Sequence, residues 1–253
     1  MHAAGRMYIW NGGSLLIGRA SGPTGLHAHH AVVLSFTFGS AMRFSSKARE
    51  WTEHRGVVIE PDYPHAFDGL GQESAHFFIE PESRDGRAIM ARLGGPGIVA
   101  IDPTQVAEAV PILRGPWATN RDDADAIRAA GQLVIRHFAG SVERASPVDE
   151  RVTSALDYIK AHIGRAITLA EVAAAVNLSP SRFRHLLVEQ TGMGLRPYIL
   201  WLRLQRAWEL VAAGHNLTSA AHGAGFADSA HLTRTSRRMF GIPPIALTLE
   251  SVS

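Results

Sequence analysis

The sequence predicts an α+β protein in two parts: a small β-barrel or sandwich followed by helices, and then an all-α domain with two helix-turn-helix motifs. The first part carries short runs of β-branched and aromatic residues, separated by turns rich in Gly, Pro and Asp about every ten residues. The second part twice repeats a short alanine-rich helix, a polar turn and a helix bearing Arg and His. A chain of 253 residues is long enough for two ordinary domains.

Turn signals separate the expected strands of the first part. An Asn-Gly-Gly turn at 11–13 and a Gly-Ser turn at 39–40 each divide two strand-like runs. The β pattern ends at the Gly-Gly-Pro-Gly stretch over 94–97, and helical periodicity follows. We expect strands over 7–10, 15–19, 31–38, 41–44, 56–60 and 75–80, helices over 102–110 and 122–138, and a linker over 140–147.

The first helix-turn-helix segment covers residues 168–192. Thr168 is a suitable N-cap, and Glu171, three residues later, completes a capping box. Ser179 before Pro180 predicts the start of the second helix. Helical spacing assigns Phe183, Leu186 and Leu187 to the buried face of that helix, and Ser181, Arg184 and His185 to the opposite face.

The second segment, over 217–241, repeats this plan. Gly225 makes the turn, Phe226 should enter the core beside it, and Asp228 or Ser229 caps the following helix. A helix over 197–213 joins the two segments and is about 25 Å long, which suits two reading helices in successive major-groove segments. Ala220, Ala221, Ala224, Leu232, Met239 and Phe240 are expected to be buried, and His231, Arg234 and Arg238 share the other face.

Residues from about 149 to 247 resemble the AraC/XylS family of bacterial transcription regulators. The strongest similarity is GFADSAHLTRTSRRMFGIPP, over 225–244, which is close to the family signature. The sequence departs from the family pattern in three places: Ser236 replaces the usual aromatic residue, residues 245–247 replace the usual Tyr-Arg pair after the final proline, and residues 222–223 are His-Gly in place of a pair that favours a helix. Because Ser236 falls on the buried face, its hydroxyl needs a partner such as the carbonyl of residue 232. We expect the change Ser236→Phe to be stabilising or tolerated.

The resemblance implies sequence-specific binding to promoter or operator DNA. Arg can bind guanine through two hydrogen bonds, whereas arginines beside the reading face bind phosphates and give affinity rather than specificity. The expected base readers are Ser181, Arg184 and His185 in the first segment and Ser229, His231 and Arg234 in the second, and the expected phosphate contacts are Arg182, Arg237 and Arg238.

Histidines in the first part suggest a ligand site. His27 and His29, with the segment around His65, resemble a small cupin-like barrel, which family members often carry as an effector-sensing domain. Metal-binding cupins add a carboxylate a few residues after the first two histidines, but residues 32–34 are Val-Val-Leu here. We therefore assign His27, His29 and His65 to an effector site and expect no bound metal or other cofactor, while a metal at these histidines remains the alternative.

Composition and charge agree with this interpretation. Residues 151–253 contain eleven basic and six acidic side chains, which gives +5, and residues 1–150 sum to −3. A hydrophobic content of 46% supports real cores. The absence of cysteine excludes disulfides and Cys-ligated zinc fingers, as well as the alkyl-accepting DNA-repair proteins that share this helix-turn-helix module. Neither a transmembrane run nor the apolar core of a signal peptide is found.

These observations predict a cytoplasmic transcription activator or repressor, not an enzyme, with three segments. Residues 1–95 form the cupin-like sensing barrel, 96–148 a helical dimerisation or linker segment, and 149–253 the DNA-binding domain. The family resemblance implies a homodimer and contact with RNA polymerase, although the helices over 102–138 would serve equally well to cap the barrel. The rival interpretation is a cupin-type enzyme or a small-molecule or metal-binding protein with a helical interaction tail; no complete ligand set or acid–base pair is visible in residues 1–90.

Overall fold

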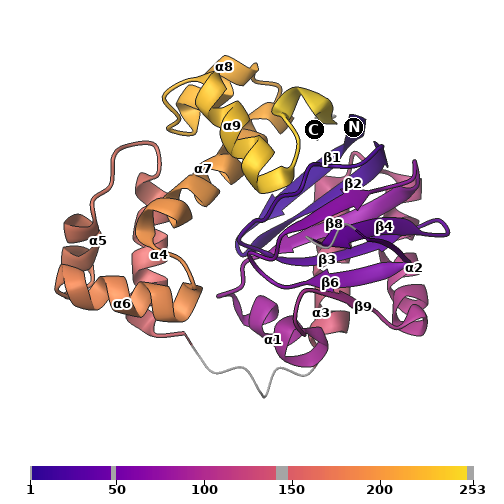
Figure 1. The fold of residues 1–253 in the computed structure, drawn as a ribbon, viewed down its shortest axis with the longest axis horizontal. Helices are drawn as coiled ribbons and strands as arrows, with labels where there is room; N and C mark the ends of the chain where they lie inside the picture. Colours follow the sequence, from indigo (N-terminus) through magenta and orange to yellow (C-terminus); the bar gives the residue numbers. More distant parts are fainter. Residues whose placement is uncertain (1, 47–49, 141–147, 250–253) are drawn as a thin grey trace. The chain divides into compact units, whose positions relative to one another are not determined.

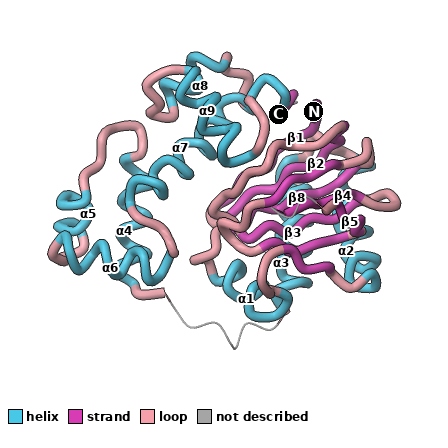
Figure 2. The backbone as a smooth tube through the Cα atoms, viewed as in Figure 1, coloured by secondary structure: helices cyan, strands magenta, loops and turns pink. Residues whose placement is uncertain are grey.

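The protein is described here by a computed structural model that covers residues 2–46, 50–140 and 148–249 (Figures 1 and 2). The chain divides into two compact units. The first unit joins Met1–Ala145 to the C-terminal segment Ser236–Ser253, and the second is Ser146–Thr235. Within the described ranges, every helix is too short or too polar to cross a lipid bilayer.

Two β-sheets form the framework of the first unit. Within the described residues, the larger has seven strands in the order β10-β1-β2-β8-β3-β6-β9, and the smaller has three in the order β5-β4-β7. Neighbouring strands are antiparallel except β1 and β10, which are parallel. The strands are β1 (His2–Trp10), β2 (Gly13–Ser21), β3 (Val32–Thr37), β4 (Met42–Ser46), β5 (Trp51–His54), β6 (Gly56–Ile59), β7 (His65–Asp68), β8 (Glu73–Ile79), β9 (Ile98–Ala100) and β10 (Leu247–Leu249).

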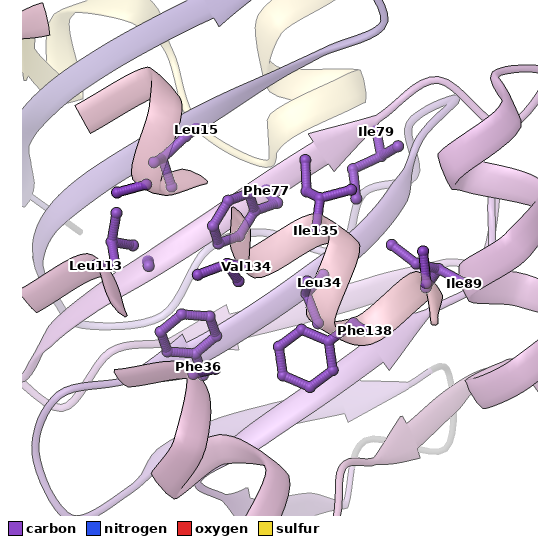
Figure 3. Packing of buried hydrophobic residues seen from close by; sticks show 14 of the residues in the cluster. Leu15, Leu34, Phe36, Phe77, Ile79, Ile89, Leu113, Val134, Ile135 and Phe138 are labelled. Atoms are coloured by element: carbon purple, nitrogen blue, oxygen red, sulfur yellow. The ribbon is translucent and has the colours of Figure 1, made fainter. Parts of the chain in front are cut away.

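Three helices cover one face of the larger sheet: α1 (Arg84–Leu93), α2 (Pro103–Thr119) and α3 (Ala124–Ala139). Successive side chains of a strand point to opposite faces, so Leu34 and Phe36 of β3 join the core under the helices, together with Phe77 of β8 and Phe138 of α3 (Figure 3). Burying such aromatic and aliphatic side chains contributes roughly 1.5–3 kcal/mol each.

The opposite face of the larger sheet is more polar and faces the smaller sheet. Ser35 and His76 are a directly opposed pair on β3 and β8, and their side chains are 2.9 Å apart from Oγ to Nδ1. The ring of Phe67 on β7 meets the His76 ring edge-on, with 4.7 Å between centroids. Strand β3 is therefore buried on both faces. One face contacts the apolar core under the helices, and the other contacts polar side chains such as His76.

Most of the expected elements are present, but several bounds differ. The first two strands begin earlier than predicted, and within the first unit β5, β7, β9, β10 and α1 were not predicted. Helix α2 continues to Thr119 through Pro111 and Pro116, where the sequence pattern had ended it at residue 110. Its buried residues Val106, Ala109, Leu113 and Trp117 keep helical spacing across Pro111, so tertiary packing outweighs the local cost of proline. The predicted linker covers residues 140–147, and all of it after Gly140 lies outside the described residues.

Helices make up the described part of the second unit: α4 (Glu150–His162), α5 (Leu169–Ala175), α6 (Pro180–Thr191), α7 (Leu195–Ala212) and α8 (Leu217–Gly223). The boundary between the units falls inside α9 (Ser229–Phe240), after Thr235. The α+β fold class with a helical C-terminal part is as predicted from the sequence.

The C-terminal segment is built into the first unit. Ser236 is fully buried, and its hydroxyl donates a hydrogen bond of 2.8 Å to the carbonyl of Ile242 rather than to residue 232. A 3₁₀ turn (Pro244–Ala246) follows, and Leu247 then pairs with Ala3 as β10 joins β1. Residues 245–247, where the sequence departs from the family pattern, thus lead into a strand.

The buried position of Ser236 reverses the expectation for its replacement. Ser236→Phe should lower the melting temperature of the full-length chain, because a phenyl group overfills a closed site, at a cost of about 1–3 kcal/mol, and removes the donor to Ile242. Thermal unfolding measures the difference. Ser219→Phe, at an exposed position of α8, is the control and should change little. A Ser236→Phe protein as stable as the wild type would show that space for the ring exists after all.

Candidate functional site

The first helix-turn-helix unit, α5 with α6, begins with the predicted capping box. The Thr168 hydroxyl accepts a hydrogen bond from the Glu171 backbone N–H at 3.2 Å, and the Glu171 carboxylate accepts one in return from the Thr168 backbone N–H. The same carboxylate binds Arg165 and, at 2.7 Å, the Tyr158 hydroxyl. The Arg165 guanidinium, followed by the Tyr158 hydroxyl, lowers the pKa of Glu171 to about 2. The start of α5 is therefore tied to α4.

Helix α6 presents its polar face to solvent. Ser179 caps it by accepting a hydrogen bond of 3.3 Å from the Arg182 N–H, and Gly192 ends it in the left-handed region with φ 74°. Phe183 and Leu187 are fully buried, as predicted, and Leu186 is half-buried. The predicted DNA-contact residues of this helix are all exposed: Ser181, Arg182, Arg184 and His185.

The second unit, α8 with α9, depends on close packing of small residues. Ala220, Ala221 and Ala224 are completely buried, as predicted. Gly225 turns the chain with φ 82°, and Phe226 is buried directly after it. Of the two cap candidates, Asp228 is the one used: its carboxylate accepts a hydrogen bond of 2.6 Å from the His231 N–H.

The predicted contact residues on α9 differ in exposure. Arg234, Arg237 and Arg238 are exposed, whereas Ser229 and His231 are half-buried. The ring of His231 stands edge-on against Phe226, with 5.1 Å between centroids. Arg234 is thus the most accessible of the three residues predicted to read bases from this helix.

In the first unit, the three predicted effector-site histidines come together. His27, His29 and His65 are each at most 7% exposed, and their ring centroids lie 4.4–5.4 Å apart. Burial, reinforced by the neighbouring His65, lowers the pKa of His27 to about 3. Burial likewise lowers the pKa values of His29 and His65. All three rings are therefore neutral at pH 7.

Other residues around this cluster were not predicted. His30 points away from the cluster toward two carboxylates, with Nδ1 3.1 Å from Asp62 and Nε2 3.3 Å from Glu82. Burial opposes the charge of His30, but these two carboxylates outweigh it and raise its pKa to about 9. Phe240, the last residue of α9, lies 5.4 Å from His29 between ring centroids. No local pattern in the sequence connects residue 240 with residue 29.

Two short bracing helices, each followed by a capped helix with exposed basic side chains, define a protein of the double helix-turn-helix class. Residues 172–248 match a family model described as a helix-turn-helix domain. The transcriptional activator RhaS of Klebsiella pneumoniae is 31% identical over 113 residues, which are 44% of this chain and 41% of RhaS. The arabinose operon regulatory protein of Escherichia coli K12 is 30% identical over 122 residues, or 47% of this chain and 42% of that protein.

Similarity of fold extends further than similarity of sequence. The crystal structure of ToxT from Vibrio cholerae O395 aligns with a TM-score of 0.58 at 12% identity, covering 93% of this chain and 96% of ToxT. The chain spans less than half the length of each of these two curated relatives. The C-terminal part of the chain is therefore similar to the helix-turn-helix domains of these regulators, as the sequence predicted.

The turn before α9 gives a direct test of how the second unit is built. A Cβ added at Gly225 would lie 2.9 Å from the Arg203 Nε and 3.0 Å from the Ile163 carbonyl oxygen, at a positive φ. Gly225→Ala should therefore destabilise the domain by about 1–3 kcal/mol in urea unfolding. Gly164→Ala is the matched control, because a Cβ there has no described neighbour within 4 Å. Equal stabilities of the two variants would contradict this account of the turn.

Proposed function

We propose that this protein is a sequence-specific DNA-binding transcription regulator controlled by a small molecule bound in its first unit. The observation that carries the proposal is the presence of two helix-turn-helix units, each with a capped second helix whose exposed face bears Arg and His. The net charge of +5 over residues 151–253 supports binding to the phosphate backbone. The curated relatives are transcription regulators, which favours this role over catalysis.

We assign different roles to the exposed side chains of the two reading helices. Arg184 and Arg234 lie on the outer faces of α6 and α9 and are suited to bidentate hydrogen bonds with guanine. Arg182, Arg237 and Arg238 flank these faces and bind phosphates. His185, Ser181, Ser229 and His231 complete the two reading surfaces, with the half-buried His231 and Ser229 contributing less contact area.

The effector site of this proposal is the histidine cluster of His27, His29 and His65. A ToxT structure has been solved with an unsaturated fatty acid bound, which is a precedent for a small-molecule ligand in this fold. We further propose that the chain acts as a cytoplasmic homodimer through α2 and α3, on which Leu133 is half exposed, and that it contacts RNA polymerase at promoters.

Capture of genomic DNA tests the proposed function. Purified full-length protein should enrich a small set of fragments that share a common sequence element. Loss of enrichment for the variant Arg184→Ala/Arg234→Ala would support the two reading helices as the binding surface. Fragments recovered at random, at every salt concentration, would refute sequence-specific recognition.

Single substitutions on α9 separate readers from phosphate contacts. Arg234→Ala should cost about 1–3 kcal/mol of binding free energy and relax the preference at one base pair. Arg237→Ala should weaken binding to all sequences alike and lower the slope of log affinity against log salt by about one unit. Binding titrations against a set of single-base operator variants measure both effects.

Arg114→Ala is the charge-matched control for this series. Arg114 is an exposed residue of α2 in the first unit. Its replacement by Ala removes one positive charge, as the α9 variants do, but at a position distant in sequence from both reading helices. We expect no change in base preference for this control. Identical specificity profiles for Arg234→Ala and Arg237→Ala would contradict the division into readers and phosphate contacts.

A further inference from the structure

We propose that His27, His29 and His65 form a binding site for a transition-metal cation of the Zn²⁺ type, held by three neutral imidazoles with one coordination position left open. The proposal takes up the alternative that the sequence left open, a metal at these histidines, in place of the expectation that none is bound, and it rests on the proposed effector site of the first unit. It stands independently of DNA binding, because it concerns a site whose described contacts all lie within that unit.

The first argument is the convergence of ligand atoms. One ring nitrogen from each histidine lies within 4.8 Å of those of the other two, and all three side chains are buried. A tetrahedral Zn²⁺ with Zn–N bonds of about 2.0–2.1 Å needs nitrogens roughly 3.3 Å apart, so each ring must move inward by less than about 1 Å. The cluster thus already has nearly the dimensions that metal binding requires.

The second argument is the tautomer of the rings. Nδ1 of His27 lies 2.8 Å from the carbonyl oxygen of Gly25, and Nδ1 of His65 lies 2.8 Å from that of Tyr63. A carbonyl oxygen can only accept, so each Nδ1 carries the proton and each Nε2 keeps a lone pair. Such second-shell hydrogen bonds orient metal-binding histidines and increase their basicity.

The third argument is rigidity of the backbone that carries the ligands. His27 and His65 exchange two backbone hydrogen bonds, of 2.9 and 2.8 Å, which fix one against the other across 38 positions of sequence. The carbonyl of His29 accepts hydrogen bonds from the backbone N–H groups of Ala31 and Asp62. Three ligands from two segments of the chain are therefore held before any ion arrives, which reduces the entropic cost of binding.

The chemistry of the cluster selects a cation of borderline softness. An imidazole that donates its Nδ1–H to a backbone carbonyl offers the lone pair of its other nitrogen, which suits a cation rather than a carboxylate or phosphate ligand. Imidazole suits Zn²⁺, Cu²⁺ and Ni²⁺, whereas Mg²⁺ and Ca²⁺ prefer oxygen. Three protein ligands leave a fourth position for water or for a donor atom of a small molecule.

The site adjoins the end of α9. Gly25 donates a backbone hydrogen bond of 3.0 Å to the carbonyl of Gly241, and a Cβ at Gly241 would lie only 2.7 Å from Nδ1 of His27. The His29 ring also contacts Phe240. Inward movement of the rings on metal binding would therefore change their contacts with Phe240 and Gly241, where helix α9 ends.

Metal titration of the tag-free full-length chain tests the proposal. After dialysis against a chelator, the protein should take up one Zn²⁺ per chain in competition with a chromophoric chelator, and Co²⁺ should give the intense visible absorption of a tetrahedral site. His27→Gln, His29→Gln and His65→Gln should each weaken binding by more than about 10-fold. His54→Gln, a histidine of β5 outside the cluster, is the control and should bind like the wild type.

Two further measurements keep the test independent of variant folding and of DNA. X-ray absorption of the Zn²⁺-loaded wild type should show three imidazoles at about 2.0–2.1 Å. Hydrogen exchange at the Gly25 amide, which bonds Gly241, should slow on loading. Absence of stoichiometric uptake, a first shell of oxygens, or undiminished binding by the triple Gln variant would each overturn the proposal. These outcomes leave the proposed DNA recognition untouched, since none of them involves DNA.

Discussion

The first unit depends on burial of the larger sheet on both faces. Along β3, Leu34 and Phe36 enter the apolar core under α1–α3, while Ser35 between them enters the polar side shared with His76. Successive side chains of a β-strand point to opposite faces of the sheet, so Ser35 must lie on the face opposite to Leu34 and Phe36. One face supplies most of the apolar burial, and the other is free to hold polar groups in fixed geometry. The histidine cluster is a product of that second, polar side.

The two candidate sites differ in the burial and the charge of their side chains. The histidines of the cluster are buried, and desolvation lowers the pKa of all three, with neighbouring histidines lowering those of His27 and His29 further. The arginines of α6 and α9 remain exposed, and their positive charge is available to an anionic partner. A buried array of neutral nitrogens favours a metal cation, and an exposed array of guanidinium groups favours phosphate. The two proposed ligands therefore differ in the sign of their charge.

Helix α9 is the element that both functions share. It is one continuous helix, whose residues up to Thr235 group with the second unit and whose residues from Ser236 group with the first. Its N-terminal half carries Arg234 and the Asp228 cap, and its C-terminal end is fixed by Ser236, Phe240 and Gly241. A helix transmits displacement along its axis because its backbone is internally hydrogen-bonded.

The sequence by itself determined the helix-turn-helix units, because the signals that build them are local. Thr168 with Glu171, Ser179 with Pro180, and Gly225 with Phe226 act within a few residues, and each has the predicted role in the structure. Helical spacing likewise assigned the buried alanines of α8 and the exposed arginines correctly.

Only the tertiary structure decided the partners that lie far apart in the chain. The contact of His29 with Phe240 joins residues that no periodic pattern relates, and the grouping of His27 and His29 with His65 was expected only from the resemblance to cupins. The partner of Ser236 is the carbonyl of Ile242 beyond the end of the helix, so the sequence placed the residue on the correct face but did not identify its partner. Helix α2 runs through two prolines because its apolar stripe packs against the sheet. Local propensity sets what a segment prefers, whereas long-range packing sets which neighbours it meets.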